Sequence, residues 1–107
     1  MDLYTSLNNL LEQLQTSVKS LRTTATEYAE AYRNYRVLLA KELVRLKDSG
    51  MAITLASDVA RGNEEIANAK MVEIKKEAIY KANMESINAI KLQIKIVENQ
   101  ITREIGL

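Results

Sequence analysis

The stretch Tyr28–Leu46, YAEAYRNYRVLLAKELVRL, decides the fold of this chain of 107 residues. It contains no glycine or proline, the two residues that most strongly interrupt helices. Its tyrosine and leucine residues recur at intervals of three and four, which places them on one stripe of an α-helix: Tyr28, Tyr32, Tyr35, Leu39, Leu43 and Leu46. Because Val37, Leu38 and Val44 lie off that stripe, we expect this helix to contact more than one partner element.

The same spacing continues from this stretch back to the start of the sequence. Apolar residues recur at intervals of three and four along the whole segment: Leu3, Leu7, Leu10, Leu14, Val18, Leu21 and Ala25. Asp2 is a residue type that caps helix N-termini, and Gly50 is a residue type that ends helices. The pattern predicts one helix over residues 3–48, which needs a partner along its length because isolated helices are marginal in water.

The second half of the chain predicts two more helices. Thr54 is a candidate cap for a short helix over residues 55–61, which Gly62 would end. This short helix has one apolar face, formed by Leu55 and Val59. Asn63 is a candidate cap for a long helix over residues 64–104.

The long third helix carries a predicted apolar seam in two parts. The first part has the spacing four, three, four: Ala67, Met71, Ile74 and Ala78. The continuation is shifted around the helix and is rich in isoleucine: Tyr80, Met84, Ile87, Ile90, Ile94, Val97 and Ile101. Runs of isoleucine also form strands, but the period of three and four favours a helix here.

These elements predict an all-α, single-domain protein over residues 1–107, folded as an antiparallel hairpin of two long helices with a short helix at its tip. Two helices enclose a thin core, so we expect a coiled-coil or helical-bundle homo-oligomer, most simply a dimer. Apolar residues outside the seams support this expectation: Val37, Leu38, Val44, Leu92 and Ile96. Alternatively, the tip helix covers the first three of them.

The composition argues against an enzyme. The chain has no histidine and no cysteine, so it lacks the commonest general base, a common nucleophile and the soft metal ligands. We therefore expect no catalytic residue, no metal and no cofactor. The net charge of +1 argues against general binding to polyanions. We see no signal peptide and no apolar run of the roughly 20 residues that a membrane span needs, and we expect a cytoplasmic protein.

Five residues at the start of the deciding stretch form a candidate ligand site: Tyr28, Tyr32, Arg33, Tyr35 and Arg36. Tyrosine rings stack on bases, and the planar arginine side chain binds phosphates through paired hydrogen bonds. This combination indicates a site for a small anionic nucleotide. The alternative is structural, with the tyrosines in the seam and the arginines paired to Glu30 or to a neighbouring chain.

A second candidate is a basic surface at the predicted tip, formed by Lys41, Arg45, Lys47 and Arg61. Nearby carboxylates at positions 64, 65, 73 and 77 oppose this charge. The segment between Leu46 and Ile66 also has the spacing of a helix-turn-helix, which would bind DNA through its second helix. Both neighbouring helices are too long for a compact unit of that kind, so DNA is the less favoured partner.

The stretch from Tyr32 to Glu104 resembles small helical proteins from the early regions of temperate phages and prophages of Gram-positive bacteria. The segments that carry the resemblance are the tyrosine–arginine start, LKDSGMAITLASDVARGNEE and YKANMESINAIKLQIKIVENQITRE. The resemblance implies a role in an infected bacterial cell. Small phage proteins of this kind bind host factors, block defence systems or assist DNA replication and recombination.

Taken together, these observations predict a non-enzymatic phage accessory protein that sequesters or inhibits a host component. Two alternatives remain: an oligomer that traps a cyclic nucleotide signal, as some anti-defence proteins do, and an accessory protein for DNA binding or recombination. The expected partners are a second copy of the chain and either a host protein or a small anionic nucleotide.

Overall fold

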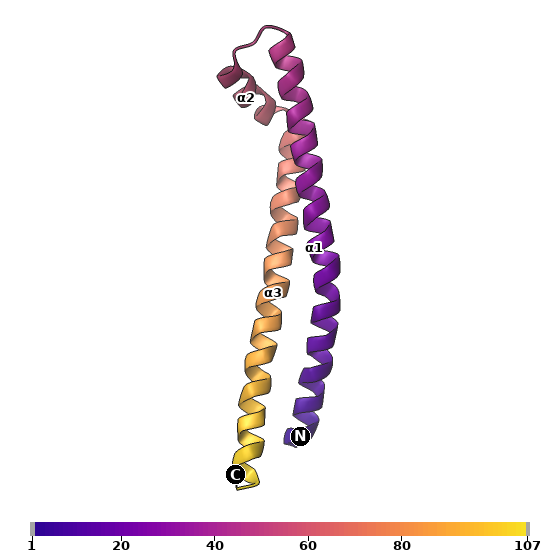
Figure 1. Cartoon of the computed structure of the whole chain (residues 1–107), viewed down its shortest axis with the longest axis vertical. Helices are drawn as coiled ribbons and strands as arrows, with labels where there is room; N and C mark the ends of the chain where they lie inside the picture. Colours follow the sequence, from indigo (N-terminus) through magenta and orange to yellow (C-terminus); the bar gives the residue numbers. More distant parts are fainter. Residues whose placement is uncertain (1, 107) are drawn as a thin grey trace. The chain divides into compact units, whose positions relative to one another are not determined.

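The computed structural model describes residues 2–106 and is helical almost throughout. It contains α1 (Leu3–Asp48), α2 (Ile53–Gly62) and α3 (Glu64–Glu104), and the described residues include no strand (Figure 1). The predicted all-α hairpin is confirmed, and the predicted long-helix ranges coincide with α1 and α3.

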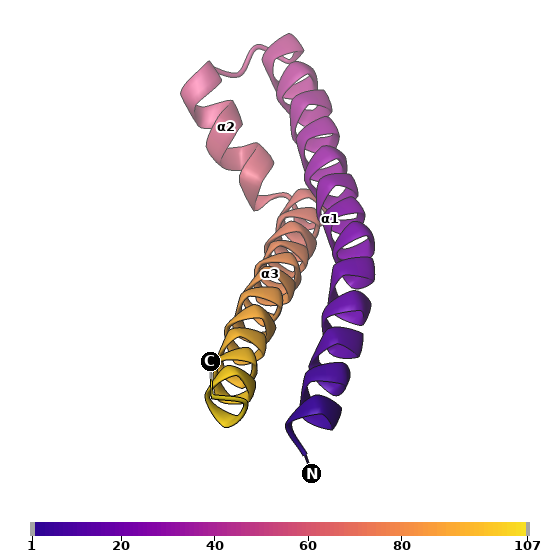
Figure 2. The ribbon, with the colours of Figure 1, turned by 60° about the horizontal axis from the view of Figure 1, so that its bottom comes forward.

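The chain divides into two compact units, and each unit pairs a segment of α1 with a segment of α3. We call Met1–Thr24 with Tyr80–Leu107 the terminal unit, and Ala25–Ile79 the tip unit. Within each unit the two segments run in opposite directions (Figure 1). The tip unit also contains α2, which runs from the end of α1 back toward the start of α3 (Figure 2).

Both ends of α1 have the local structure that the sequence predicts. The Asp2 carboxylate accepts a hydrogen bond of 2.8 Å from the Thr5 amide, which caps the first turn and lowers the pKa of Asp2. At the other end Gly50 has a φ of 95°, a left-handed conformation that suits glycine. The Gly50 amide donates to the Lys47 carbonyl and the Met51 amide to the Leu46 carbonyl, which is the hydrogen-bond pattern of a Schellman motif.

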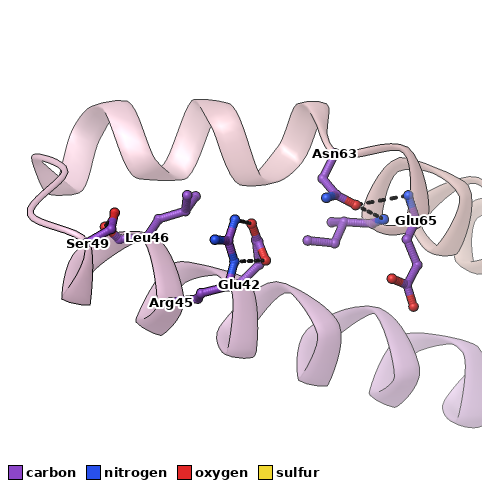
Figure 3. Close-up of polar contacts among 7 residues, drawn as sticks. Glu42, Arg45, Leu46, Ser49, Asn63 and Glu65 are labelled. Carbon is purple, nitrogen blue, oxygen red and sulfur yellow. Dashed lines mark hydrogen bonds and ion pairs between the residues drawn. The ribbon is translucent and has the colours of Figure 1, made fainter.

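The two remaining caps differ in outcome. The Asn63 side chain accepts hydrogen bonds from the amides of Glu65 (3.0 Å) and Ile66 (3.3 Å), so this predicted cap is confirmed (Figure 3). The predicted Thr54 cap is wrong: α2 begins at Ile53, and the preceding residue makes no side-chain capping bond. The start of α2 is therefore set by tertiary packing instead of by a cap.

Two alanines of α2 form the centre of the tip-unit core. Ala56 and Ala60 are each 0% exposed and belong to one cluster with residues of the long helices: Tyr35, Leu39, Leu46, Ile66 and Ala69. Leu55 and Val59 lie on one face of α2, as predicted, but this face is exposed and α2 packs through the side that carries Ala56 and Ala60. A helix that packs through alanines brings its backbone close to its neighbour, and the larger side chains are left on the outside.

The first part of the predicted α3 seam is also wrong. The buried residues of α3 in the tip unit are Ile66, Ala69 and Glu73, whereas the four predicted seam residues are exposed: Ala67, Met71, Ile74 and Ala78. The observed stripe follows a regular heptad, since steps of seven residues from Ile87 lead back to Glu73 and Ile66. Counted back in the same heptad register, the isoleucine stripe therefore reaches the buried carboxylate of Glu73 in the tip unit.

The terminal unit buries the isoleucine-rich part of α3 as predicted. Ile87, Ile90 and Ile94 are buried, and the facing leucines of α1 are half-buried: Leu3, Leu7, Leu10, Leu14 and Leu21. Asn83 lies at a seam position, where its amide donates to the Ser17 carbonyl (3.0 Å) and accepts from the Thr24 hydroxyl (3.0 Å). These bonds satisfy a polar side chain within an apolar seam.

Most of the apolar residues predicted to lie outside the seams are exposed. Val37 and Val44 on α1 are exposed, as are Leu92 and Ile96 on α3. Leu38 alone among these five packs against the tip core. The tip helix therefore does not cover Val44, and the described chain leaves these faces open.

Candidate binding surfaces

A buried carboxylate dominates the interior of the tip unit. Glu73 is 4% exposed, and its carboxylate accepts a hydrogen bond of 2.9 Å from the Lys70 ammonium. The same ammonium lies 4.8 Å from the ring centroid of Tyr35, a cation–π distance. The hydrogen bond from Lys70 to Glu73 raises the pKa of Lys70. These contacts hold Lys70 and Tyr35 within the structure of the hairpin.

Two further polar contacts connect α1 to α3 in the tip unit. The Tyr28 hydroxyl donates to the Glu77 carboxylate at 2.9 Å, which raises the pKa of Tyr28. The Lys76 ammonium lies 3.0 Å from the Glu27 carboxylate. Polar pairs of this kind contribute little net stability but favour one alignment of two helices over others.

The structure does not gather the five residues of the candidate ligand site. Tyr28 and Tyr35 face α3, whereas Tyr32, Arg33 and Arg36 are exposed. Arg33 precedes Tyr35 by two residues and so lies about 200° away around the helix. Tyr28 and Tyr35 thus have structural contacts, whereas Tyr32 is exposed on the side of α1 that carries Arg33 and Arg36.

Two of the four cations in the candidate basic surface are bound by neighbouring side chains. Arg45 makes two hydrogen bonds, of 2.6 and 3.0 Å, to the carboxylate of Glu42, which lowers the pKa of Glu42 (Figure 3). The Arg61 side chain donates to the Ser57 hydroxyl at 2.7 Å. The other two members of the set are exposed: Lys41 and Lys47. The start of α3, which a helix-turn-helix would present to DNA, carries two exposed carboxylates, Glu64 and Glu65, which repel phosphates.

A predominantly apolar groove lies between α1 and α2 of the tip unit. It has a volume of about 320 Å³ and is lined by Leu43, Val44, Lys47, Ile53, Ala56 and Ser57. Val44 is 60% exposed and Ile53 is 66% exposed, so both side chains are open to a partner. The sequence signals Val44 through its position off the main stripe, but Ile53 falls in a segment that we took as the connection before α2.

A second hollow in the tip unit is lined by Tyr35 of the candidate ligand site and by Arg61 of the candidate basic surface. It has a volume of about 270 Å³ and is lined by Tyr35, Arg61, Ile66, Ala67 and Lys70. Its lining combines apolar side chains with two cations. The structure thus brings Tyr35 and Arg61 together, which the sequence did not predict.

Two other kinds of site were searched for within residues 2–106. No group of three or more acidic side chains is arranged to hold a metal ion there. No helix in that range is long and apolar enough to cross a membrane.

Comparisons with protein-family models, with curated proteins and with solved structures give no match to this chain. The resemblance to phage proteins therefore stays a prediction.

Proposed function

We propose that this protein acts by binding another protein through the groove between α1 and α2 of the tip unit. The observation that carries the proposal is the apolar lining of this groove beside two exposed side chains, Val44 and Ile53. A groove of about 320 Å³ accepts one or two apolar side chains of a partner helix. Lys47 lies in the lining, where it is placed to pair with a carboxylate of that partner.

The exposed side chains give the groove a useful amount of binding energy. Complete burial of a valine or isoleucine contributes about 1.5–3 kcal/mol, and Val44 and Ile53 still have more than half of their surface to bury. Side chains in a packed pocket at the centre of an interface contribute most to affinity. With the resemblance to phage early proteins, we propose that the partner is a host component, which binding sequesters or inhibits in the cytoplasm of the bacterial cell.

The test compares two variants of α1 that place a carboxylate on its outer side. Val44→Glu changes the groove, and Val37→Glu changes an exposed valine seven residues earlier, outside it. Tagged protein is purified from the host cell, and the co-purified protein is then titrated against each purified variant by calorimetry. We expect Val44→Glu to weaken binding at least about tenfold and Val37→Glu to leave it unchanged. Equal binding by both variants would reject the groove.

A second candidate function has one specific observation in its favour, which is the hollow formed by Tyr35, Arg61 and Lys70. Arg61 beside an aromatic ring suits a small anion with a planar body, such as a cyclic nucleotide, and Lys70 would contribute donors besides the one that binds Glu73. Native mass spectrometry of protein purified without denaturation tests this candidate. Extra mass of a few hundred daltons in the wild type and its loss in Arg61→Ala would support it, with Arg33→Ala as the exposed control.

A further inference from the structure

The outer side of α3 in the tip unit carries an apolar stripe that nothing in the described chain covers. Its members are the four exposed residues Ala67, Met71, Ile74 and Ala78. They lie roughly opposite the buried stripe of Ile66, Ala69 and Glu73, given a turn of about 100° per residue. This segment of α3 thus has apolar side chains on two sides, with Ile66 and Ala69 buried beside Glu73 and the stripe exposed, whereas a surface helix usually has one apolar side.

The surface area of the whole chain is large enough to accommodate a second copy. The accessible surface is 7779 Å², whereas a folded monomer of 12.1 kDa is expected to expose about 6,000 Å². The excess is roughly 1,800 Å², and a stable interface buries about 800 Å² on each partner. The chain therefore exposes more surface than a folded monomer of its mass needs, and this excess is larger than the area that one copy buries in a stable dimer.

The spacing of residues along the stripe is the same in both directions, so the stripe can pack against an identical stripe that runs the opposite way. If two α3 helices pack antiparallel with the two-fold axis between positions 72 and 73, Ala67 of one copy faces Ala78 of the other. Met71 then faces Ile74. The larger side chains interlock at the centre, and the alanines at both ends let the helices approach closely.

The charges at the start of α3 favour this direction over a parallel one. Glu64 and Glu65 are exposed in the first turn, so a parallel pair would place four carboxylates side by side. An antiparallel pair holds the two acidic ends roughly 25 Å apart and sets the helix dipoles in opposite directions.

We propose that the stripe Ala67, Met71, Ile74 and Ala78 is a homodimer interface in which α3 packs antiparallel against α3 of a second copy. This surface consists of residues outside the α1–α2 groove, so the inference does not depend on the proposed function. The stripe shares no residue with that groove, whereas Ala67 belongs both to the stripe and to the lining of the second hollow.

The first test measures mass in solution for the wild type and two charge variants of α3. Met71 is 48% exposed and lies on the stripe; Ile79 is 49% exposed and lies on another side of the helix. We expect twice 12.1 kDa for the wild type and for Ile79→Glu. Met71→Glu should raise the dissociation constant of the dimer about 100-fold or more, because it places two carboxylates in an apolar contact. A wild-type monomer, or a dimer equally stable in Met71→Glu, would overturn the proposal.

The second test determines the direction of packing and uses the absence of cysteine from the chain. Ala67→Cys and Ala78→Cys are oxidised separately and as a mixture. The antiparallel arrangement predicts a disulfide between the two different variants and none within either, because identical positions are about 16 Å apart along the axis. A disulfide formed by Ala67→Cys with itself would establish parallel packing and contradict the proposed interface.

Discussion

The two units of this hairpin are built from the same pair of helices but bury different kinds of residue where the helices meet. In the terminal unit α3 contributes Ile87, Ile90 and Ile94, and the polar exception is the hydrogen-bonded Asn83. In the tip unit the seam contains Glu73, which is paired with Lys70. Burial of apolar side chains provides stability, whereas a buried ion pair discriminates between alignments of two helices. The difference indicates that the terminal unit depends on its buried isoleucines, whereas the tip unit combines a larger apolar core with an ion pair that favours one alignment of its helices.

The largest loss of stability is expected when a charge is placed among the buried isoleucines of the terminal unit. Ile90→Asp should lower the free energy of unfolding by about 4 kcal/mol or more, because it buries a carboxylate without a partner. Ile96→Asp, on an exposed face of the same helix, should change it by less than about 0.5 kcal/mol. Urea denaturation followed by circular dichroism measures both. A small effect of Ile90→Asp would mean that Ile90 is not a core residue.

A smaller effect is expected when the charged pair of the tip seam is changed one residue at a time. Lys70→Leu should destabilise the protein, since it leaves the Glu73 carboxylate buried and unpaired. Glu73→Leu should leave stability unchanged or raise it by about 1 kcal/mol, because leucine extends the apolar heptad. Denaturation curves of the two variants at pH 7 provide the comparison. The opposite order of stabilities would contradict the contrast between the seams.

The hydrogen bond between Tyr28 and Glu77 predicts that the wild type and Tyr28→Phe differ in the pH dependence of their stability, and only in alkaline solution. The pKa of Tyr28 is raised in the folded chain, so its contribution is complete below the ordinary value of 10.0 and is lost as pH rises through the folded pKa. Above about pH 10 the wild type should therefore lose stability more steeply than Tyr28→Phe. Thermal melts of both proteins between pH 8 and 11 measure the two slopes, and parallel slopes would mean that the hydroxyl is not held by Glu77.

The smallest effect is expected at the polar position of the terminal seam. Asn83→Leu removes two hydrogen bonds and adds apolar surface, so the two changes should cancel to within about 1 kcal/mol. Hydrogen exchange of the amides around Ser17 should nevertheless become faster if Asn83 fixes the alignment of the helices. Unchanged exchange would assign Asn83 no role in alignment.

Periodicity was sufficient to predict the three helices and most of their ends. It failed where burial did not follow apolar character. A pattern of apolar residues predicts that Met71 and Ile74 are buried and that Glu73 is exposed. It cannot detect that Lys70, three residues earlier, pairs with the buried carboxylate of Glu73. It also ranks Leu55 above Ala56, although the smaller side chain is the one that lets α2 approach the core.

The candidate sites were harder to predict than the fold because they depend on residues far apart in sequence. Tyr28 to Arg36 reads as one motif along the chain, but the turn of the helix sends its members to different faces. The groove joins Val44 to Ile53 across the Gly50 turn, and the second hollow joins Tyr35 to Arg61. No local pattern contains either pair.

The two buried alanines of α2 give the two sides of this helix a different tolerance to substitution. Ala56 and Ala60 have no exposed surface, so any larger residue at either position must push α2 away from the core. Substitutions on the outer side, at Leu55 and Val59, meet no such barrier. The outer side of α2 can therefore change its chemistry without moving the helix, while the inner side is restricted to residues as small as alanine.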